Sequence, residues 1–250
     1  MEKKKRIVIV GATSAIAEHC ARRWVQGQSV DLTLVGRDLI RTERVAADLQ
    51  VRSPQSMIRV VHMDFLDPIA IQHMVDAVAA QGALDTVLIA HGSLPEQSTC
   101  QRDLTACYTA LEINAVSPVL YAEAFATHLA RAGYGTLALI GSVAGDRGRK
   151  SNYVYGAAKG LLTRYAEGLQ HRFAGTCVKI VLIKPGPTDT PMTDHLKQQG
   201  VKLAPVEAVA EQVNRAIDRG RRVAYVPSQW QFIMGVIRLL PAFVFNRLNL

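Results

Sequence analysis

Short apolar runs alternate with longer amphipathic stretches along most of the chain. Six runs are rich in Val, Ile and Leu and lack alternating polar positions, at residues 7–10, 32–35, 58–62, 86–90, 136–140 and 178–183. Such runs are typical of strands that are covered on both faces of a sheet. The stretches between them have helical spacing, at residues 14–27, 38–50, 67–81, 101–131 and 152–173. Alternating strands and helices predict a parallel sheet with right-handed crossovers.

Length and composition fit one domain built on such a sheet. The chain has 250 residues, of which 49% are hydrophobic and 20% charged, and no linker or repeat divides it. We therefore expect one α/β domain over residues 1–227, a doubly wound parallel sheet with helices on both faces. Within it, 186–220 is expected to form a lid over the substrate and 223–226 one more strand. Residues 228–250 are interpreted as an apolar, basic tail.

Cysteine and histidine usage gives no support for a metal site. The four cysteines are scattered without a C-x-x-C pair, and the seven histidines lack ligand spacing such as H-E-x-x-H. We expect no metal and a reduced compartment. Residues 3–17 also resemble a signal peptide, with a basic start and a small-residue site at 15–17. Cleavage there would remove the first strand, so we interpret the protein as cytoplasmic.

The net charge of +8 is concentrated at the two ends of the chain. Residues 2–6 carry +3, and residues 221–250 contain four arginines and no acid. A nucleic-acid-binding protein would more often carry a broad basic face with interleaved aromatics, so we expect no nucleic-acid partner. Basic ends beside apolar residues suit an anionic membrane surface. Simple solubility of the two ends is an equally open interpretation.

The turn after the first strand has the position of a phosphate-binding loop. Backbone N–H groups at such a turn, and the positive end of the following helix, favour a pyrophosphate. Only the first glycine of a Gly-rich loop is present, and Ala15 and Ala17 stand where further glycines are expected. An ordinary strand-to-helix turn is the alternative. The expected cofactor-binding residues here are Gly11, Thr13, Ser14 and Ile16.

The residues at the end of the second strand distinguish a site for NAD from a site for NADPH. An acid at this place would bind the ribose 2′-hydroxyl of NAD. The chain has Gly36 and Arg37 instead, and Asp38 is placed to cap the next helix. Arg37 favours the 2′-phosphate of NADPH, with a solvated loop arginine as the alternative.

The most informative stretch runs from residue 139 to residue 159. Tyr155 and Lys159 are four residues apart and therefore share one face of a helix. About 0.25 such pairs are expected by chance in this composition, and about 0.01 when a serine must stand thirteen residues earlier, where Ser142 is found. Tyr153 is not equivalent, because the residue four positions later is Ala157.

Together these motifs resemble the short-chain dehydrogenase/reductase family over about residues 6–220. The matching positions follow the family's order and spacing: the loop at 11–17, Asp64, Asn114, Ser142, Tyr155-x-x-x-Lys159 and Pro185-Gly186-x-x-x-Thr190. The resemblance implies a Rossmann-type fold, a nicotinamide cofactor and carbonyl reduction.

The resemblance also implies a role for each matching residue. Tyr155 would be the general acid, its pKa lowered by Lys159 and the oxidised nicotinamide, and Lys159 would also hold the nicotinamide ribose. Ser142 would orient the substrate oxygen, and Asn114 would hold a water in a proton relay. Further cofactor contacts are expected from Asp64, Ala90, Gly92, Pro185, Gly186, Thr188 and Thr190.

One segment departs from the family's pattern. Residues 88–92 read Leu-Ile-Ala-His-Gly where the family often has Asn-Asn-Ala-Gly. Ala90 has no side-chain amide to stabilise the end of the strand. We interpret His91 as structural rather than catalytic.

Basic residues between Ser142 and Tyr155, and in the lid, are candidates for substrate binding. A phosphate clamp and a solvated basic loop are both open interpretations of Arg147, Arg149, Lys150 and His195. The tail is interrupted by Arg238 and Pro241, so it is too short and broken for a spanning helix, and two short helices are expected. It is interpreted either as an interfacial membrane anchor or as an arm across a subunit interface or the pocket.

Three stretches resemble one subgroup more closely, the decaprenylphosphoryl-2-keto-ribose reductases. They are GSVAGDRGRKSNYVYGAAK, KPGPTDTPMTDHLK and YVPSQWQFIMGVIRLLP. This resemblance implies NADPH-dependent reduction of a lipid-linked keto-sugar at the cytoplasmic membrane face, with a partner oxidase that makes the ketone. The alternatives are a soluble reductase of a 3-oxoacyl or small ketone substrate and a dinucleotide-binding sensor without turnover. A homo-oligomer is expected in either enzyme case.

Overall fold

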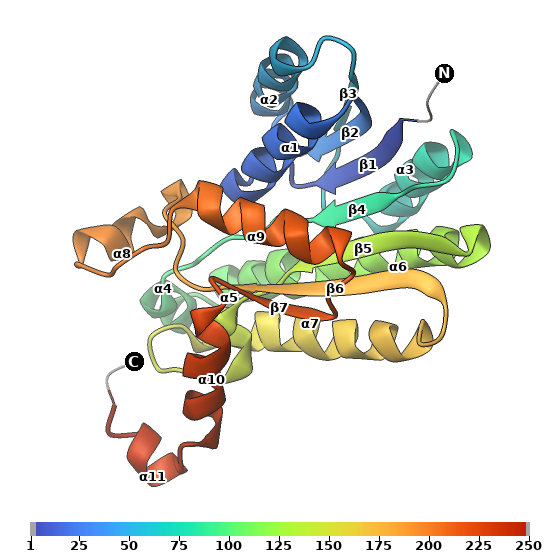
Figure 1. The fold of residues 1–250 in the computed structure, drawn as a ribbon. Helices are drawn as coiled ribbons and strands as arrows, with labels where there is room; N and C mark the ends of the chain where they lie inside the picture. Colours follow the sequence, from blue (N-terminus) through green and yellow to red (C-terminus); the bar gives the residue numbers. More distant parts are fainter. Residues whose placement is uncertain (1–3, 249–250) are drawn as a thin grey trace.

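The computed structural model describes residues 4–248 and is built around one seven-stranded parallel sheet (Figure 1). Its strand order is β3-β2-β1-β4-β5-β6-β7. The strands are β1 (Lys5–Val10), β2 (Val30–Gly36), β3 (Met57–His62), β4 (Thr86–Ile89), β5 (Tyr134–Ile140), β6 (Cys177–Pro185) and β7 (Val223–Val226). All six apolar runs and the seventh strand are therefore confirmed, as is the doubly wound α/β fold.

Helices connect the strands and extend the chain beyond them. The α-helices are α1 (Ala15–Gly27), α2 (Leu39–Arg52), α3 (Pro68–Ala80), α4 (Gln97–Arg102), α5 (Leu104–Leu111), α6 (Ser117–Ala132), α7 (Tyr153–Arg172), α8 (Asp194–Gln198), α9 (Val206–Asp218), α10 (Gln229–Leu239) and α11 (Ala242–Phe245). Short turns of other helical types are η1 (Glu112–Val116), η2 (Val143–Asp146) and η3 (Pro191–Thr193). No helix within residues 4–248 is long and apolar enough to cross a membrane.

Alternate residues of each central strand enter two separate cores. Ile7 and Ile9 of β1 pack with α1, α2 and α9 on one face, whereas Val8 and Val10 pack with α3, α6 and α7 on the other. Because successive side chains of a strand point to opposite faces, a strand covered on both sides must be apolar throughout. This explains why the apolar runs of the sequence lack alternating polar positions.

The strand order reverses between β1 and β4, which places a crevice at their carboxyl ends. β1 pairs with β2 on one side and with β4 on the other, so the chain after β1 and the chain after β4 diverge to opposite faces. Ligands of open parallel sheets bind at such a point. The loops beginning at Gly11 and Ala90 meet there.

The stretch of helical spacing at 101–131 is not one continuous helix. The segment contains α4, α5, the π-helical turn η1 and α6. Asp103 ends α4 and caps α5 by accepting from the Thr105 N–H at 2.8 Å, and Pro118 stands in the first turn of α6. In η1 the Asn114 side chain donates to the Ala110 carbonyl at 2.9 Å. Helical spacing alone does not reveal these interruptions.

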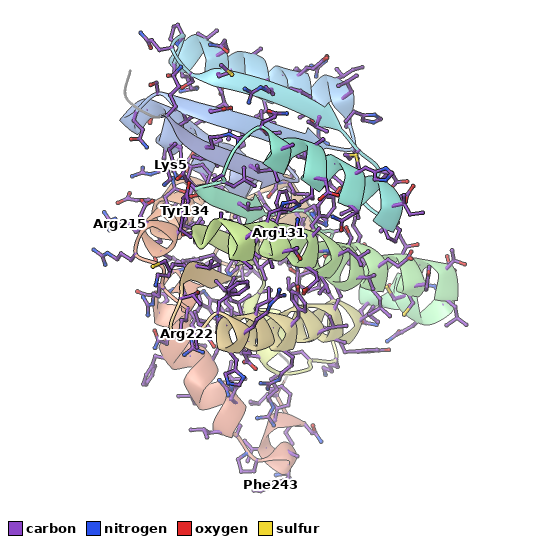
Figure 2. The ribbon with its side chains drawn as sticks, turned by 90° about the vertical axis from the view of Figure 1, so that its right-hand side faces the viewer. Lys5, Arg131, Tyr134, Arg215, Arg222 and Phe243 are labelled. Atoms are coloured by element: carbon purple, nitrogen blue, oxygen red, sulfur yellow. The ribbon has the colours of Figure 1, made fainter. Side chains whose placement is uncertain are left out.

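The tail forms two short helices, as expected. α10 ends before Pro241, and α11 follows it directly. Both extend from the end of β7 and lie beyond the sheet, and Figure 2 shows Phe243 at the far end of this extension. Met234 is the one fully buried residue of α10.

Candidate active site

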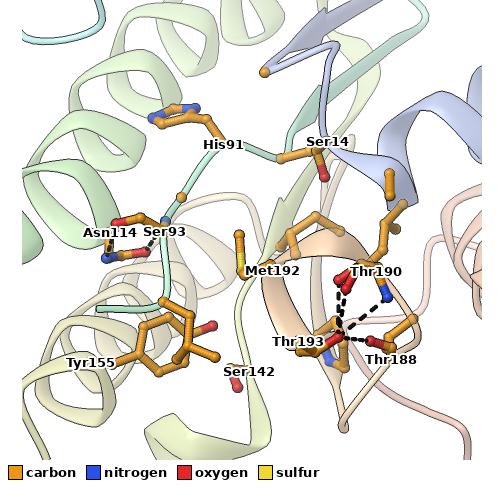
Figure 3. A pocket seen from close by; sticks show the side chains of 18 of the residues that line it. Ser14, His91, Ser93, Asn114, Ser142, Tyr155, Thr188, Thr190, Met192 and Thr193 are labelled. Carbon is orange, nitrogen blue, oxygen red and sulfur yellow. Dashed lines mark hydrogen bonds between the residues drawn. The ribbon is translucent and has the colours of Figure 1, made fainter. Parts of the chain in front are cut away.

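A cavity of about 780 Å³ opens at the carboxyl ends of the strands. It is lined by the loops after β1, β2, β4, β5 and β6 and by the first turns of α7. In Figure 3, Ser14 lies across the cavity from Ser142 and Tyr155, and a group of threonines lies beside them. The fold thus brings residues from both halves of the chain to one cavity.

Ser142, Tyr155 and Lys159 lie together in this cavity. Tyr155 and Lys159 are one turn apart on α7, with the Lys159 Nζ 5.8 Å from the centre of the tyrosine ring. Lys159 is 3% exposed, and its Nζ donates to the Ile140 carbonyl at 3.1 Å. Ser142 follows β5, and its Oγ accepts from the Ala144 N–H at 3.1 Å. The arrangement joins a hydroxyl acid, a second hydroxyl and a buried cation.

Burial changes the titration of this group of residues. Burial raises the pKa of Tyr155, and a hydrogen bond to Ser142 opposes the rise. Burial lowers the pKa of Lys159 to about 8. The expected lowering of the Tyr155 pKa by Lys159 is not seen in the protein by itself, because desolvation of the tyrosinate dominates. Tyr155 is therefore protonated at neutral pH.

Asn114 lines the same cavity and lies next to the loop after β4. Its Oδ1 accepts from the Ser93 N–H at 3.0 Å, which fixes the loop after β4 (Figure 3). A Cβ added to Gly92 would stand 2.8 Å from the Asn114 Oδ1 and 3.5 Å from the Lys159 Nζ. Asn114 and Lys159 therefore face one small space that only glycine leaves open.

The loop after β1 has the features of a phosphate-binding turn. Gly11 has a φ of +85°, and a Cβ there would meet the His91 backbone N at 2.5 Å. Ser14 precedes α1 without capping it through its side chain, so the positive end of α1 is open to the cavity. Thr13, Ser14 and Ile16 line the cavity as expected. These groups fit a pyrophosphate.

Arg37 lines the same end of the cavity, beside Arg41, which the sequence analysis missed. Asp38 caps α2 by accepting from the Arg41 N–H at 2.9 Å, as expected. Two arginines and no free acid at this position fit a 2′-phosphate. Asp64 does not line the cavity, and its carboxylate instead accepts from the Leu66 N–H at 3.1 Å.

His91 lines the cavity and also links three elements. Ser117 Oγ donates to the Phe65 carbonyl at 2.6 Å, so the His91 Nε2 donates to that hydroxyl at 2.8 Å. Burial lowers the pKa of His91 to about 3. A neutral ring held in this way connects the end of β4 to α6 and to the loop after β3. The geometry agrees with a structural role.

The segment after β6 forms the remaining wall. Thr188 Oγ1 donates to the Gly186 carbonyl at 2.9 Å, and the Thr190 and Thr193 hydroxyls lie 3.2 Å apart (Figure 3). A Cβ on Gly186 would stand 2.0 Å from the Trp230 Nε1 of α10. The remaining expected cofactor-binding residues that line this cavity are Ala90, Gly92, Pro185, Gly186, Thr188 and Thr190.

Of the four basic candidates for substrate binding, only Arg149 lines the cavity. Arg147 turns to the tail, where its Nη1 donates to the Leu240 carbonyl at 2.6 Å and its guanidinium lies 3.9 Å from the Phe245 ring centre. Lys150 and His195 are exposed outside the lining. A four-residue clamp is therefore not assembled here, because the tail occupies Arg147. Among residues 4–248, no cluster of three or more potential metal ligands is found.

Comparison with known proteins identifies the family. Residues 5–200 match the model of the short chain dehydrogenase family. The chain belongs to this family. An uncharacterized oxidoreductase of Mycobacterium tuberculosis is 30% identical over 243 residues, covering 97% of this chain and 96% of its own. Another from Streptomyces coelicolor is 29% identical and covers 98% and 96%.

Solved structures of short-chain dehydrogenases have the same fold. One from Burkholderia cenocepacia in complex with NADP has a TM-score of 0.83 at 17% identity and covers 100% of both chains. One from Sphingobium yanoikuyae in complex with NADPH has a TM-score of 0.80 at 20% identity and covers 98% and 96%. Because of its family match and its oxidoreductase relatives, this chain is an NAD(P)-dependent oxidoreductase of the short-chain dehydrogenase family.

Proposed function

We propose that this short-chain dehydrogenase is an NADPH-dependent carbonyl reductase acting on a polyprenyl-phosphate-linked 2-keto-pentose. The observation that carries the reductase assignment is the group formed by Tyr155 with the buried Ser142 and Lys159. It faces an open helix end and two arginines across one cavity. NADPH, when bound there, supplies the hydride. The substrate proposal is supported by the subgroup resemblance of residues 141–159, 184–197 and 225–241.

Tyr155 is the proposed acid. Reduction of a carbonyl requires a proton at its oxygen, and burial keeps Tyr155 protonated at neutral pH. Ser142 holds the same oxygen through its hydroxyl and stabilises the charge that develops on it. Lys159 holds the nicotinamide ribose. Asn114, at the space beside Gly92, positions a water through which the proton of Tyr155 is replaced.

NADPH is the proposed cofactor in preference to NADH. Arg37 and Arg41 would bind a 2′-phosphate, while Asp38 is engaged as a helix cap. The bare N-terminus of α1 at Ser14 would bind the pyrophosphate. Ala15 lines the cavity at this helix start. Its methyl group leaves less space for the pyrophosphate than a glycine at this position would.

The substrate proposal implies further partners. A 2-keto-sugar on a lipid phosphate must be supplied by an enzyme that oxidises the alcohol, so a partner oxidase is proposed. We also propose a cytoplasmic location with peripheral membrane contact through residues 228–250, and a homo-oligomeric state. The exposed apolar side chains of α10 and α11 support the membrane contact.

NADPH oxidation with a polyprenyl-phosphoryl 2-keto-pentose tests the proposal, beside NADH and a 3-oxoacyl thioester. We expect turnover of the keto-sugar with NADPH and its loss in Tyr155→Phe. Turnover of only the thioester or a small ketone would overturn the lipid-linked substrate and leave the reductase. Full biological function of Tyr155→Phe would overturn the reductase in favour of a non-catalytic sensor.

A further inference from the structure

Two buried polar atoms of the catalytic loop have no partner within residues 4–248. They are the Arg149 Nε and the Asn152 Oδ1, and both residues line the active-site cavity. They lie on the loop between Ser142 and α7. Buried polar groups are almost always hydrogen-bonded, so an unpaired donor and an unpaired acceptor on one loop need an explanation.

The charge of Arg149 is poorly compensated by the protein. Its Nη2 meets the Met234 sulfur at 3.3 Å, a weak acceptor. Asp146 is the one acid that favours its charge, and that carboxylate pairs with Lys184 and accepts from the Tyr225 hydroxyl at 2.7 Å. Burial lowers the pKa of Arg149. A partly buried guanidinium without its own anion is costly unless a ligand supplies one.

The Asn152 side chain does not cap its helix and is free to bind a ligand. It stands at the N-cap of α7, where an asparagine side chain normally accepts from the first turn, yet it makes no cap hydrogen bond. Gln97 from α4 instead accepts from the Val154 N–H at 3.0 Å. The start of this 20-residue helix adds positive potential next to Arg149.

We infer that Arg149 and Asn152 form a subsite for the substrate, in which Arg149 binds the phosphoryl group and Asn152 binds a substrate hydroxyl next to it. The guanidinium donates to phosphoryl oxygens, and the Asn152 Oδ1 accepts from the hydroxyl. The buried Met234 of α10 provides an apolar wall beside the phosphoryl. The inference rests on the proposed function, because it assigns to this loop the anionic part of the substrate whose ketone meets Tyr155.

Binding without turnover tests the subsite. Geranyl phosphate and geraniol are titrated calorimetrically into the NADP⁺-saturated protein. We expect the phosphate to bind more tightly than the alcohol, and Arg149→Gln to remove about 10- to 100-fold of that preference, as for a buried charge-assisted hydrogen bond. Asn152→Asp should also weaken phosphate binding, because a carboxylate then faces the phosphoryl.

Lys150→Gln is the matched control, since it removes a charge from an exposed position of the same loop. It should leave both affinities within about twofold, as for an exposed, screened charge. If Lys150→Gln and Arg149→Gln lose the same amount of affinity for geranyl phosphate, the binding comes from a diffuse basic field and the specific subsite is overturned. Undiminished phosphate preference in Arg149→Gln, with native NADPH affinity, would overturn the inference outright.

A further ligand distinguishes a lipid phosphate from a phosphate that carries no lipid. Coenzyme A carries phosphates without a lipid, and we expect it to bind more weakly than geranyl phosphate and without dependence on Arg149. Arg149-dependent binding of coenzyme A alone would overturn the lipid-linked source. Turnover of the polyprenyl-phosphoryl 2-keto-pentose with NADPH by wild type is measured in parallel. Its absence, with Arg149-dependent phosphate binding intact, would contradict the reductase proposal and not the subsite.

Discussion

Two tyrosines at the start of α7 separate a catalytic role from a structural one. Tyr155 is half-buried and hydrogen-bonded to Ser142, whereas Tyr153 is 44% exposed and accepts from the Gln101 amide at 3.2 Å. We expect Tyr155→Phe to lower kcat by about 10²- to 10⁴-fold, as for loss of a general acid, with NADPH affinity kept. Tyr153→Phe should keep kcat within a few-fold. Stopped-flow NADPH oxidation and fluorescence titration measure the two quantities.

The buried Lys159 makes stability depend on pH in a defined direction. Its pKa is lowered to about 8, below the unfolded value of about 10.4. Between these two pH values the unfolded chain binds more protons, so this residue makes the free energy of unfolding rise with pH. The rise approaches about 1.4 kcal/mol per pH unit.

Urea unfolding of the cofactor-free protein at pH 7, 8, 9 and 10 checks this dependence against Lys159→Met. The free energy of unfolding of wild type, relative to that of the variant, should increase as the pH rises above 8. A difference that stays constant from pH 7 to 10 would contradict the lowered pKa of Lys159.

At the scale of elements, the catalytic loop is held by its close approach to α7. A Cβ on Gly145 would stand 2.7 Å from the Lys159 carbonyl carbon, whereas a Cβ on Gly148 of the same loop would meet nothing within 4 Å. Gly145→Ala should cost about 1–3 kcal/mol of stability, as for an overpacked core. It should also lower kcat, because Ser142 moves with the loop.

Gly148→Ala is the matched control, and thermal unfolding with steady-state kinetics measures both variants. We expect it to keep the melting temperature and kcat. A Gly145→Ala protein with native melting temperature and native kcat would show that the contact does not position Ser142.

The sequence predicted most elements but not how loop and tail meet. The strands follow from short apolar runs such as 7–10, and Ser142, Tyr155 and Lys159 from spacing. The partners of Arg147 do not follow, because Leu240 lies 93 residues away and no local pattern joins them. Asn152 was missed for a related reason, since an N-cap asparagine normally serves its own helix.

At the scale of the whole molecule, the tail presents apolar and basic side chains on one extension. Phe232, Leu239 and Phe243 are 78%, 85% and 68% exposed, while residues 228–250 contain two arginines and no acid. Figure 2 shows Phe243 at the far end of this extension. Large exposed apolar side chains mark a contact surface, and the uncompensated positive charge favours an anionic bilayer over a second copy of the same basic tail.

The tail therefore predicts binding to anionic vesicles. We expect co-sedimentation with phosphatidylglycerol vesicles, weakened by salt, and little with phosphatidylcholine alone, because the arginines are drawn by anionic lipid. Phe232→Ser and Phe243→Ser should each weaken binding by roughly tenfold or more, from about 1.5–3 kcal/mol for each buried aromatic ring. Val51→Ser, at an 82% exposed position of α2, is the control and should bind as wild type does. Dissociation of an oligomer by the two phenylalanine variants, with no vesicle binding by wild type, would instead make the tail an arm between subunits.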